Sequence, residues 1–512
     1  MRSTRAQSCL ATVLLVSASG STATAQLLLD VETRGNANSP ATSDNFGCAV
    51  SVSGTWAAVG AQQDSSGAGF VALYSQASNY WTWHSEIQAT THSTGDNFGH
   101  SVSLFSSDLA VGAYKRPGTY SGSGAAYVFH WNGTSWSQQV VLAAGSGGAD
   151  EEANAWFGYS VSLYNDLLVV GCPNKDESGQ SDAGAAYIYK YVSGSWQFVQ
   201  KLTAPTATAS DYFGWSVATN GTTILIGAPG DDNTNGTDAG AVYEYTFSGS
   251  AWSLNGAGGK LIPPSSFALG QFGFSVASAI VTGLGAANNS AYVVGSLKYD
   301  SGLGHIFPDT SVAGTAFITW RTPTTLAWNS FTVAPDISYG GDGFGISVGV
   351  EENGRVVVGA NEGQFGGGTN GQAFVYHPSF GATPSWQRNS NPPNLNPTSP
   401  LGTGSGNHHD WFGRAVALYG AGSVVTVLVG SHFGDTSSVT DTGIAYFFRS
   451  HCYANCDNST ATPILNANDF QCFLTAYSNG TSYANCDGST GSPTLNANDF
   501  QCYLNMYALG CS

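Results

Sequence analysis

Residues 96–114 read DNFGHSVSLFSSDLAVGAY, a Phe-Gly pair followed by two short apolar runs and a Gly-Ala ending. Related stretches recur along the chain, and each has a variable residue after Phe-Gly, then Ser or Ala, then Val. Their phenylalanines are Phe46, Phe98, Phe157, Phe213, Phe272, Phe344 and Phe412. A spacing of roughly 50 to 70 residues indicates that each copy forms one supersecondary unit.

Each clear copy contains four strand-like runs. In the second copy they are residues 101–105, 109–113, 125–129 and 136–142, with Gly, Ser and Asn in the turns between them. No long segment before residue 450 has helical periodicity. Seven units of four antiparallel strands predict an all-β, seven-bladed β-propeller, in which both faces of each blade are buried.

The two ends of the repeat region predict how the ring closes. The seventh copy stops after residues 445–448 and lacks the fourth strand, whereas residues 27–31 form a strand that belongs to no complete copy. We therefore expect the N-terminal strand to complete the last blade, which removes an open sheet edge. An open solenoid would instead need capping repeats at both ends.

The units, as in DYFGWSVATNGTTILIGAPGDD at residues 211–232, resemble FG-GAP repeats, the sevenfold propeller units of integrin alpha chains and of many exported bacterial proteins. The resemblance covers roughly residues 27–450 and implies a propeller domain over residues 26–450. The family's calcium hairpins between the first two strands are absent, because those turns are short, as at residues 105–108. Acidic clusters occur one loop later, at residues 176–182 and 231–238, and are either weak calcium sites or solvated loops.

The residue after each Phe-Gly differs between copies. The seven are Cys48, His100, Tyr159, Trp215, Phe274, Ile346 and Arg414. Because each blade contributes one, the fold is expected to place them in a ring near the axis. The integrin resemblance implies that this position and the one before Phe-Gly form an aromatic cup for a basic side chain of a partner. The candidate partner-binding residues are His100, Trp156, Tyr159, Tyr212, Trp215, Phe274, Trp411 and Arg414.

Aromatic rings in a concave setting fit either cation–π capture or sugar stacking. Alternatively, these rings merely plug the axial channel.

Charge limits the classes of partner. The 512 residues include 15 Lys and Arg against 33 Asp and Glu, so the formal net charge is −18. Such a surface repels nucleic acid and anionic lipid, and neither is an expected partner. The expected partner is an extracellular protein or glycan.

The N-terminus reads as a signal peptide over residues 1–25. Arg2 and Arg5 precede an apolar run at residues 9–18 and a small-residue cleavage site, Ala-Thr-Ala, at residues 23–25. The run is far shorter than the roughly 20 residues of a spanning helix, and no later segment is long and apolar enough to span. We expect a secreted or cell-surface protein with no membrane span.

A small module is predicted over residues 451–512. YANCDNSTATPILNANDFQCFLTAY at residues 453–477 recurs as YANCDGSTGSPTLNANDFQCYLNMY at residues 483–507. Each copy offers an oxygen-rich loop and then a short amphipathic helix, with Asn468 or Asp469 capping the first helix. On one helix face we expect Phe470, Phe473 or Leu474, and Tyr477.

Both loops fit an EF-hand-type calcium site. The candidate ligands are Asn455, Asp457, Ser459, the carbonyl of Ile464, Asn466 and Asp469 in the first loop, and Asn485, Asp487, Ser489, the carbonyl of Thr494, Asn496 and Asp499 in the second. Paired loop-helix units of this kind resemble dockerin modules, which implies docking to a cohesin-like receptor. The cysteines within each copy leave open that disulfides alone hold the module.

The cysteines divide into two groups. Cys452, Cys456, Cys472, Cys486, Cys502 and Cys511 crowd into the C-terminal module, as in a disulfide-stapled exported domain. Six cysteines allow fifteen connectivities. Internal symmetry favours pairing Cys456 with Cys472 and Cys486 with Cys502, which leaves Cys452 with Cys511. Cys48 and Cys172 lie in the repeats and are expected to be buried thiols.

No nucleophile elbow, pair of catalytic carboxylates or zinc spacing stands out, and His408, His409 and Asp410 read as a loop. We therefore expect no enzyme. The predicted function is an exported, non-catalytic binding or adhesion protein. Its propeller recognises a protein or glycan, and its C-terminal module provides calcium-dependent docking or surface attachment. The alternative is an extracellular polysaccharide-degrading lyase or hydrolase, because propellers also host enzymes.

Overall fold

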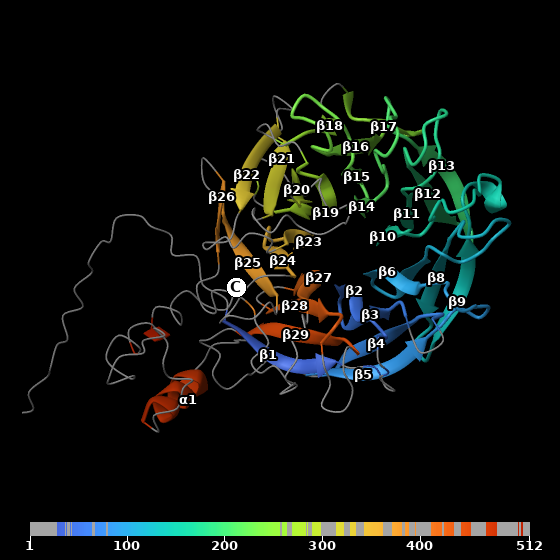
Figure 1. Ribbon diagram of the computed structural model, residues 1–512. Helices are drawn as coiled ribbons and strands as arrows, with labels where there is room; N and C mark the ends of the chain where they lie inside the picture. The colour runs from blue at the N-terminus through green and yellow to red at the C-terminus, as the bar shows by residue number, and fades with distance from the viewer. Residues whose placement is uncertain are drawn as a thin grey trace, which may run out of the picture.

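The computed structural model describes residues 28–35, 37, 41, 43–63, 67–77, 80–256, 259–263, 269–282, 284, 289–297, 314–321, 328–333, 343–361, 371–380, 384–388, 395, 411–421, 424–434, 442–451, 467–478, 500 and 503–504. Within these residues the strands form seven separate antiparallel sheets, which surround one axis as the blades of a propeller (Figure 1). The predicted all-β, seven-bladed fold is confirmed.

Six blades follow the order of the chain, from the innermost strand outward. Blade 1 is β2 (Phe46–Ser53), β3 (Trp56–Ala61), β4 (Phe70–Ala77) and β5 (Tyr80–Ile87); blade 2 is β6 (Phe98–Phe105), β7 (Asp108–Ala113), β8 (Ala125–Trp131) and β9 (Trp136–Leu142). Blade 3 is β10 (Ser160–Tyr164), β11 (Leu167–Cys172), β12 (Ala185–Val192) and β13 (Ser195–Leu202); blade 4 is β14 (Ser216–Thr219), β15 (Thr223–Ala228), β16 (Ala241–Phe247), β17 (Trp252–Leu254) and β18 (Lys260–Leu261). Blade 5 is β19 (Phe272–Val281), β20 (Asn289–Ser296), β21 (Thr315–Arg321) and β22 (Trp328–Val333); blade 6 is β23 (Phe344–Val350), β24 (Val356–Ala360), β25 (Gln372–Ser379) and β26 (Ser385–Arg388).

Blade 7 joins the two ends of the propeller. Its strands are β27 (Phe412–Ala421), β28 (Val424–Ser431), β29 (Ile444–His451) and β1 (Leu28–Gly35), in that order. β1 pairs antiparallel with β29, from Leu28 opposite His451 to Gly35 opposite Ala445. The predicted closure by the N-terminal strand is confirmed, and this strand extends four residues beyond the expected segment.

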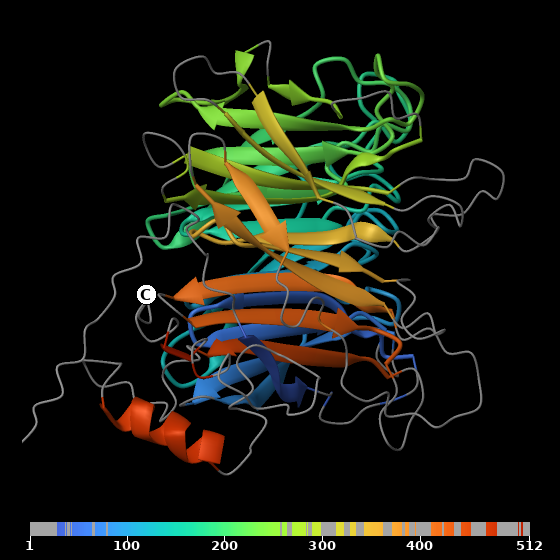
Figure 2. The same cartoon turned by 90° about the vertical axis from the view of Figure 1, so that its left-hand side faces the viewer.

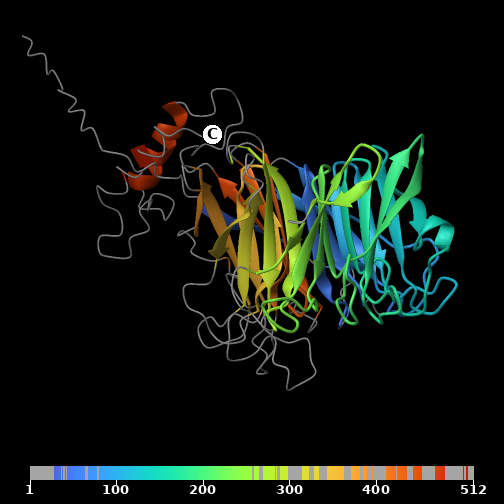
Figure 3. The ribbon, with the colours of Figure 1, turned by 90° about the horizontal axis from the view of Figure 1, so that it is seen from above.

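The strand ends gather on two opposite faces of the ring, which Figure 3 shows edge-on. The first strand of each blade begins at its Phe-Gly pair or, in blades 3 and 4, just after it, and we call that side the Phe-Gly face. The first and second strands are joined at the other side, as between Phe105 and Asp108, and we call it the hairpin face.

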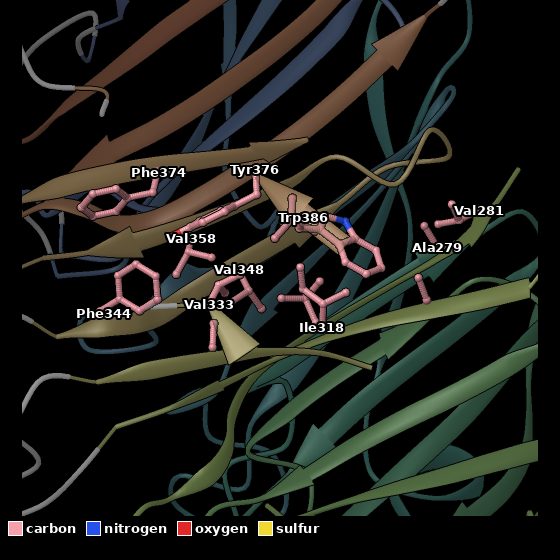
Figure 4. Packing of buried hydrophobic residues seen from close by; sticks show 14 of the residues in the cluster. Ala279, Val281, Ile318, Val333, Phe344, Val348, Val358, Phe374, Tyr376 and Trp386 are labelled. Atoms are coloured by element: carbon pink, nitrogen blue, oxygen red, sulfur yellow. The ribbon is translucent and has the colours of Figure 1, made fainter. Parts of the chain in front are cut away.

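Neighbouring blades pack face to face, as the view across the axis shows (Figure 2). The inner strands are buried on both faces; every residue of β11 and of β15 is buried. Between blades 5 and 6, Ile318 and Val333 meet Phe344, Tyr376 and Trp386 (Figure 4). Burying each large apolar side chain contributes about 1.5–3 kcal/mol, so these contacts between blades stabilise the ring.

Each Phe-Gly pair docks on the preceding blade. Phe98 is fully buried, and its N–H donates to the carbonyl oxygen of Ala68 in blade 1 at 2.9 Å. Ser101 donates its hydroxyl to the carbonyl oxygen of Gly158 in blade 3 at 3.0 Å. Ser160, Ser216, Ser275 and Ser347 donate in the same way to the next blade. The Ser two residues after most Phe-Gly pairs is therefore a contact between blades.

The next-to-last residue of each second strand is a glycine, and it permits this docking. A Cβ atom built on Gly112 would lie only 1.9 Å from the carbonyl oxygen of Gly158. The equivalent glycines would meet the next Phe-Gly glycine at 2.0 or 2.1 Å; they are Gly60, Gly171, Gly227, Gly295, Gly359 and Gly430. Any side chain at these positions would push two blades apart.

The C-terminal module is described in part. α1 (Ala467–Ser478) begins before Asn468 and Asp469, so the prediction that either residue caps this helix is wrong; both lie in its first turn. Phe473 of α1 stacks on Tyr503 with ring centroids 3.8 Å apart, and both side chains are fully buried. The predicted aromatic face of the repeat therefore packs the two copies together.

The described cysteines agree with the predictions except that Cys48 is only partly buried. Cys472 is disulfide-bonded, and its partner lies outside the described residues, so the predicted pairing stays a prediction. Cys48 and Cys172 are free, Cys172 is buried, and Cys48 is partly buried. Among the helices of the described segments, none has the length and apolarity of a membrane-spanning helix.

Replacing Gly99 by Ala should destabilise the ring more than replacing Gly95 by Ala. Both glycines have φ near +90°, so each Ala variant suffers about 1–2 kcal/mol of left-handed strain. At Gly99 the added Cβ would also meet the carbonyl oxygen of Phe70 at 2.5 Å, whereas at Gly95 it would meet nothing within 4 Å. Overpacking adds about 1–3 kcal/mol for Gly99→Ala alone. Urea unfolding of both variants measures the difference; equal losses would contradict the role given to the docked turn.

Candidate functional site

A tight turn sets the direction of the variable residue in every blade. The N–H of that residue donates to the carbonyl of the residue before Phe-Gly, as from His100 to Asn97 and from Trp215 to Tyr212. The intervening glycine has φ between +88° and +94° in all seven turns. Because the turn repeats around the ring, seven variable side chains reach the axis from one face.

The structure brings these variable residues together. The ring centroid of Tyr159 lies 4.7 Å from that of His100 and 4.7 Å from that of Trp215, and Trp215 lies 5.5 Å from Phe274. Ile346 packs with Phe274 in one buried cluster. The sequence therefore identified residues that share one location, while their role in binding a partner stays a prediction.

Arg414 is the charged member of this ring. Burial, together with the positive charges of Arg414 and Lys115, lowers the pKa of His100 to about 3. Burial and Arg414 likewise lower the pKa of His432 to about 3. The Nδ1 of His100 donates to the Oε1 of Gln62 at 2.5 Å. His100 is thus a neutral, hydrogen-bonded residue of the ring.

A cavity of about 390 Å³ opens on the Phe-Gly face beside this ring. Blades 3, 4 and 5 supply its walls, which include four aromatic side chains: Trp156, Tyr212, Trp215 and Phe274. All four are predicted partner-binding residues. We call this cavity the aromatic pocket.

The residues before Phe-Gly reach the aromatic pocket from a strained backbone. Trp156 has φ of +63°, Tyr212 of +56° and Gln271 of +47°, and all three line the pocket. Blades 1 and 2 have Asn at this position and blade 6 has Gly, residues that adopt left-handed φ at little cost. A large side chain with such a φ costs about 1–3 kcal/mol, and strained residues of this kind cluster at functional sites.

Two oxygen acceptors also line the aromatic pocket. The Oδ1 atom of Asn174 is buried and has no hydrogen-bond partner. Burial and the neighbouring Asp232 raise the pKa of Asp238, which means that its charged form lacks compensation there. A positively charged or hydrogen-bond-donating ligand would satisfy both groups.

Sequence reasoning missed six of the residues that line this pocket, among them Asn174, Asp238 and Gln271. Asn174, Asp238 and Gln271 come from loops whose side chains meet only after three blades have packed. The sequence did single out Asp238, because it lies in the acidic cluster at residues 231–238, but that loop was interpreted as a weak calcium site or a solvated segment. Its backbone N–H donates to Asp232, and its side chain borders the aromatic pocket.

The remaining predicted residues lie elsewhere or outside the described segments. Trp411 packs against His432 and Phe433, with ring centroids 5.0 and 5.1 Å away. Of the predicted calcium ligands, Asp469 alone is described; it is fully buried in the first turn of α1. No group of three or more His, Cys, Asp or Glu side chains in the described part of the chain is arranged to hold a metal ion. The segment from His408 to Asp410 is not described.

Comparisons with known proteins support the interpretation of the repeats. Four segments match the family model described as FG-GAP repeat; they are residues 36–72, 81–129, 136–189 and 196–245. No curated protein matches the chain. Among solved structures, the chain is similar to Kuenenia stuttgartiensis hydrazine synthase, with 9% identity, 66% of this chain and 78% of that chain covered, and a TM-score of 0.41. That likeness is too distant to indicate a function.

His100 should make the folded state sensitive to acid. A histidine in the unfolded chain has a pKa of about 6.5, whereas that of folded His100 is lowered to about 3. The unfolded state therefore binds more protons between these values, so stability is full above pH 6.5 and decreases as the pH falls toward 3. In His100→Gln, the loss of stability between pH 7 and pH 4.5 should be smaller by roughly 2–3 kcal/mol.

Urea unfolding at both pH values tests this prediction. The control is His92→Gln, which replaces an exposed histidine and should keep the pH dependence of the original chain. Identical pH dependence in the His100 variant and the original chain would show that His100 does not titrate in this way.

Proposed function

Because this chain is a seven-bladed propeller with FG-GAP repeats, we propose that it is an exported, non-catalytic protein that binds an extracellular partner through its Phe-Gly face. The observation that supports this most is the aromatic pocket. Trp156, Tyr212 and Gln271 occupy left-handed backbone positions where blades 1, 2 and 6 have Asn or Gly, and all three line the pocket; blade 7 has a tryptophan there as well, Trp411, which lies outside the pocket. Because blades 1, 2 and 6 pack with a smaller residue at this position, we assign the large side chains at the pocket to a ligand.

The ligand that fits best is a basic side chain of a partner protein. Tryptophan and tyrosine attract a cation through the faces of their rings. Asp238 lines the same pocket, and a cation beside it would offset the cost of burying its carboxylate. The net charge of −18 would also speed the encounter with a basic partner. A glycan is the alternative ligand, since sugars also stack on aromatic rings.

A polysaccharide-degrading enzyme has less support. Glycosidases of the usual kind use a pair of carboxylic acids that flank the scissile bond. Asp238 is the one acidic side chain among the residues that line the aromatic pocket. The proposal therefore assigns this pocket to binding.

Binding of a basic side chain should depend on Trp215. Acetyl-arginine amide, titrated against tryptophan fluorescence, should bind, and its neutral analogue acetyl-citrulline amide should bind more weakly. Trp215→Leu removes a π face and keeps an apolar side chain, so the association constant for acetyl-arginine amide should fall by about 3- to 30-fold. Asp238→Asn should weaken binding as well, because it removes the negative charge.

The matched control for this titration is Trp83→Leu. Trp83 is 45% exposed on β5 of blade 1 and is not among the residues that line the aromatic pocket. Its replacement should leave binding unchanged. Equal affinity for the arginine and citrulline amides, or unchanged affinity in Trp215→Leu, would exclude cation capture at this pocket.

We also propose that the C-terminal module binds calcium and serves as a docking unit. Asp469 supports this, because a fully buried carboxylate at the start of a helix is placed as the last ligand of a calcium loop is. Its equivalent in the second copy is Asp499. When bound, calcium would cross-link each loop to the helix that follows it.

Calcium should therefore stabilise the module. Calorimetry of the full chain should record heat of calcium binding, and the double variant Asp469→Asn and Asp499→Asn should lose it. Chelation should lower the melting temperature of the original chain and leave that of the double variant unchanged. No heat, together with an unchanged melting temperature on chelation, would mean that disulfides alone hold the module.

A further inference from the structure

The second strand of each blade starts on the hairpin face with a residue that differs between blades. Trp56 holds this position in blade 1, opposite Ser53, and Asp108 holds it in blade 2, opposite Phe105. In blade 3 the residue is Leu167. Blades 1, 2 and 3 therefore carry three different side chains at one structurally equivalent position.

Between blades 1 and 2, the indole of Trp56 fills this place. Its ring centroid lies 4.8 Å from Trp131, 5.2 Å from Trp136 and 4.9 Å from His84. Trp131 and Trp136 pair across the hairpin of β8 and β9, and His84 is the extra residue of a bulge in β5. Between blades 3 and 4, Leu167 packs in one buried cluster with Trp252.

Between blades 2 and 3, the same place is open. Tyr191 and Trp196 pair across their hairpin as Trp131 and Trp136 do, and Gln139 is the extra residue of a bulge as His84 is. Asp108 is smaller than Trp56, and its carboxylate accepts a hydrogen bond from the Nδ1 of His130 at 2.7 Å. A cavity of about 460 Å³ remains.

The walls of this cavity combine aromatic faces with polar groups. Tyr191 and Trp196 lie on one side, with ring centroids 5.5 Å apart. Ser107, Gln139 and Asn165 contribute neutral donors and acceptors. Gln139 already accepts a hydrogen bond from the Nε1 of Trp196 at 3.3 Å, which holds the indole in place.

The carboxylates of this cavity each face a basic group. Asp108 is paired with His130, and Asp166 lies 3.3 Å from the Nζ of Lys190. The cavity therefore differs from the aromatic pocket, where the lining carboxylate of Asp238 is destabilised by Asp232, a second carboxylate outside the lining. A neutral ligand with one apolar face and several hydroxyl groups matches these walls.

We propose that the cavity between blades 2 and 3 on the hairpin face binds a neutral pyranose ring of a glycan. The ring takes the place that the indole of Trp56 occupies one blade earlier, with its C–H face against Trp196 and Tyr191. Its hydroxyls bond to Ser107, Gln139 and Asn165. This site lies at the opposite ends of the strands from the aromatic pocket, because β6 begins at Phe98 on one face and ends at Phe105 on the other.

Saturation-transfer NMR on the full chain tests the proposal with four methyl glycosides, those of glucose, galactose, mannose and N-acetylglucosamine. At least one should receive saturation, most strongly at its ring C–H protons. Asp108→Trp rebuilds the packing found between blades 1 and 2, and should weaken binding at least about tenfold by filling the cavity. Trp196→Leu, which removes an aromatic wall without filling the cavity, should weaken it too.

Two control variants distinguish glycoside binding at this cavity from ligand binding at the aromatic pocket. Trp215→Leu alters the aromatic pocket alone and should leave glycoside binding unchanged, and Trp83→Leu should do the same. Saturation of none of the four glycosides would overturn the proposal. So would saturation that persists in Asp108→Trp, or that is lost in Trp215→Leu, since the sugar would then bind elsewhere.

Discussion

The contact on which the propeller depends is the close approach of two glycine backbones between neighbouring blades. The Cα of Gly112 lies so near the carbonyl of Gly158 that a Cβ atom would have no room, and Gly430 meets Gly47 in the same way where the ring closes. Seven such contacts set the spacing of the blades. They also fix the orientation of the Phe-Gly turn, and the variable side chain after this turn therefore points toward the axis.

This constraint separates the positions that must repeat from those that are free to differ. Phenylalanine, glycine and the serine after them bury or bond between blades, so they recur. The residues on either side of Phe-Gly are held in place by the turn without being part of the contact. Trp156 and Tyr212 are examples of such a difference. Blade 2 has Asn97 at the same position, and the two large aromatic residues adopt the left-handed backbone that an asparagine adopts at less cost.

The sequence was sufficient to predict the blades, their order and the closure by the N-terminal strand, because each depends on local periodicity and on a missing strand. It also identified the ring of variable residues, since one position per blade must converge. It did not reveal the contributions of Asn174 and Asp238 to the aromatic pocket. Those side chains come from loops of different blades, and their meeting depends on how far each loop extends after packing. The start of α1 was misplaced because Asn and Asp are favourable both as caps and in a first helical turn.

Because the blades repeat, residues at equivalent positions of different blades can be compared within one molecule. Trp56, Asp108 and Leu167 occupy one position on a nearly constant framework, so the cavity beside Asp108 results from the side chain rather than from a change of backbone. The same reasoning applies to Asn97 and Trp156 on the other face. The two candidate sites share no lining residue and lie at opposite ends of the strands. Substitutions in one should therefore act additively with those in the other, and the rigid packing between blades allows each face to hold its own ligand.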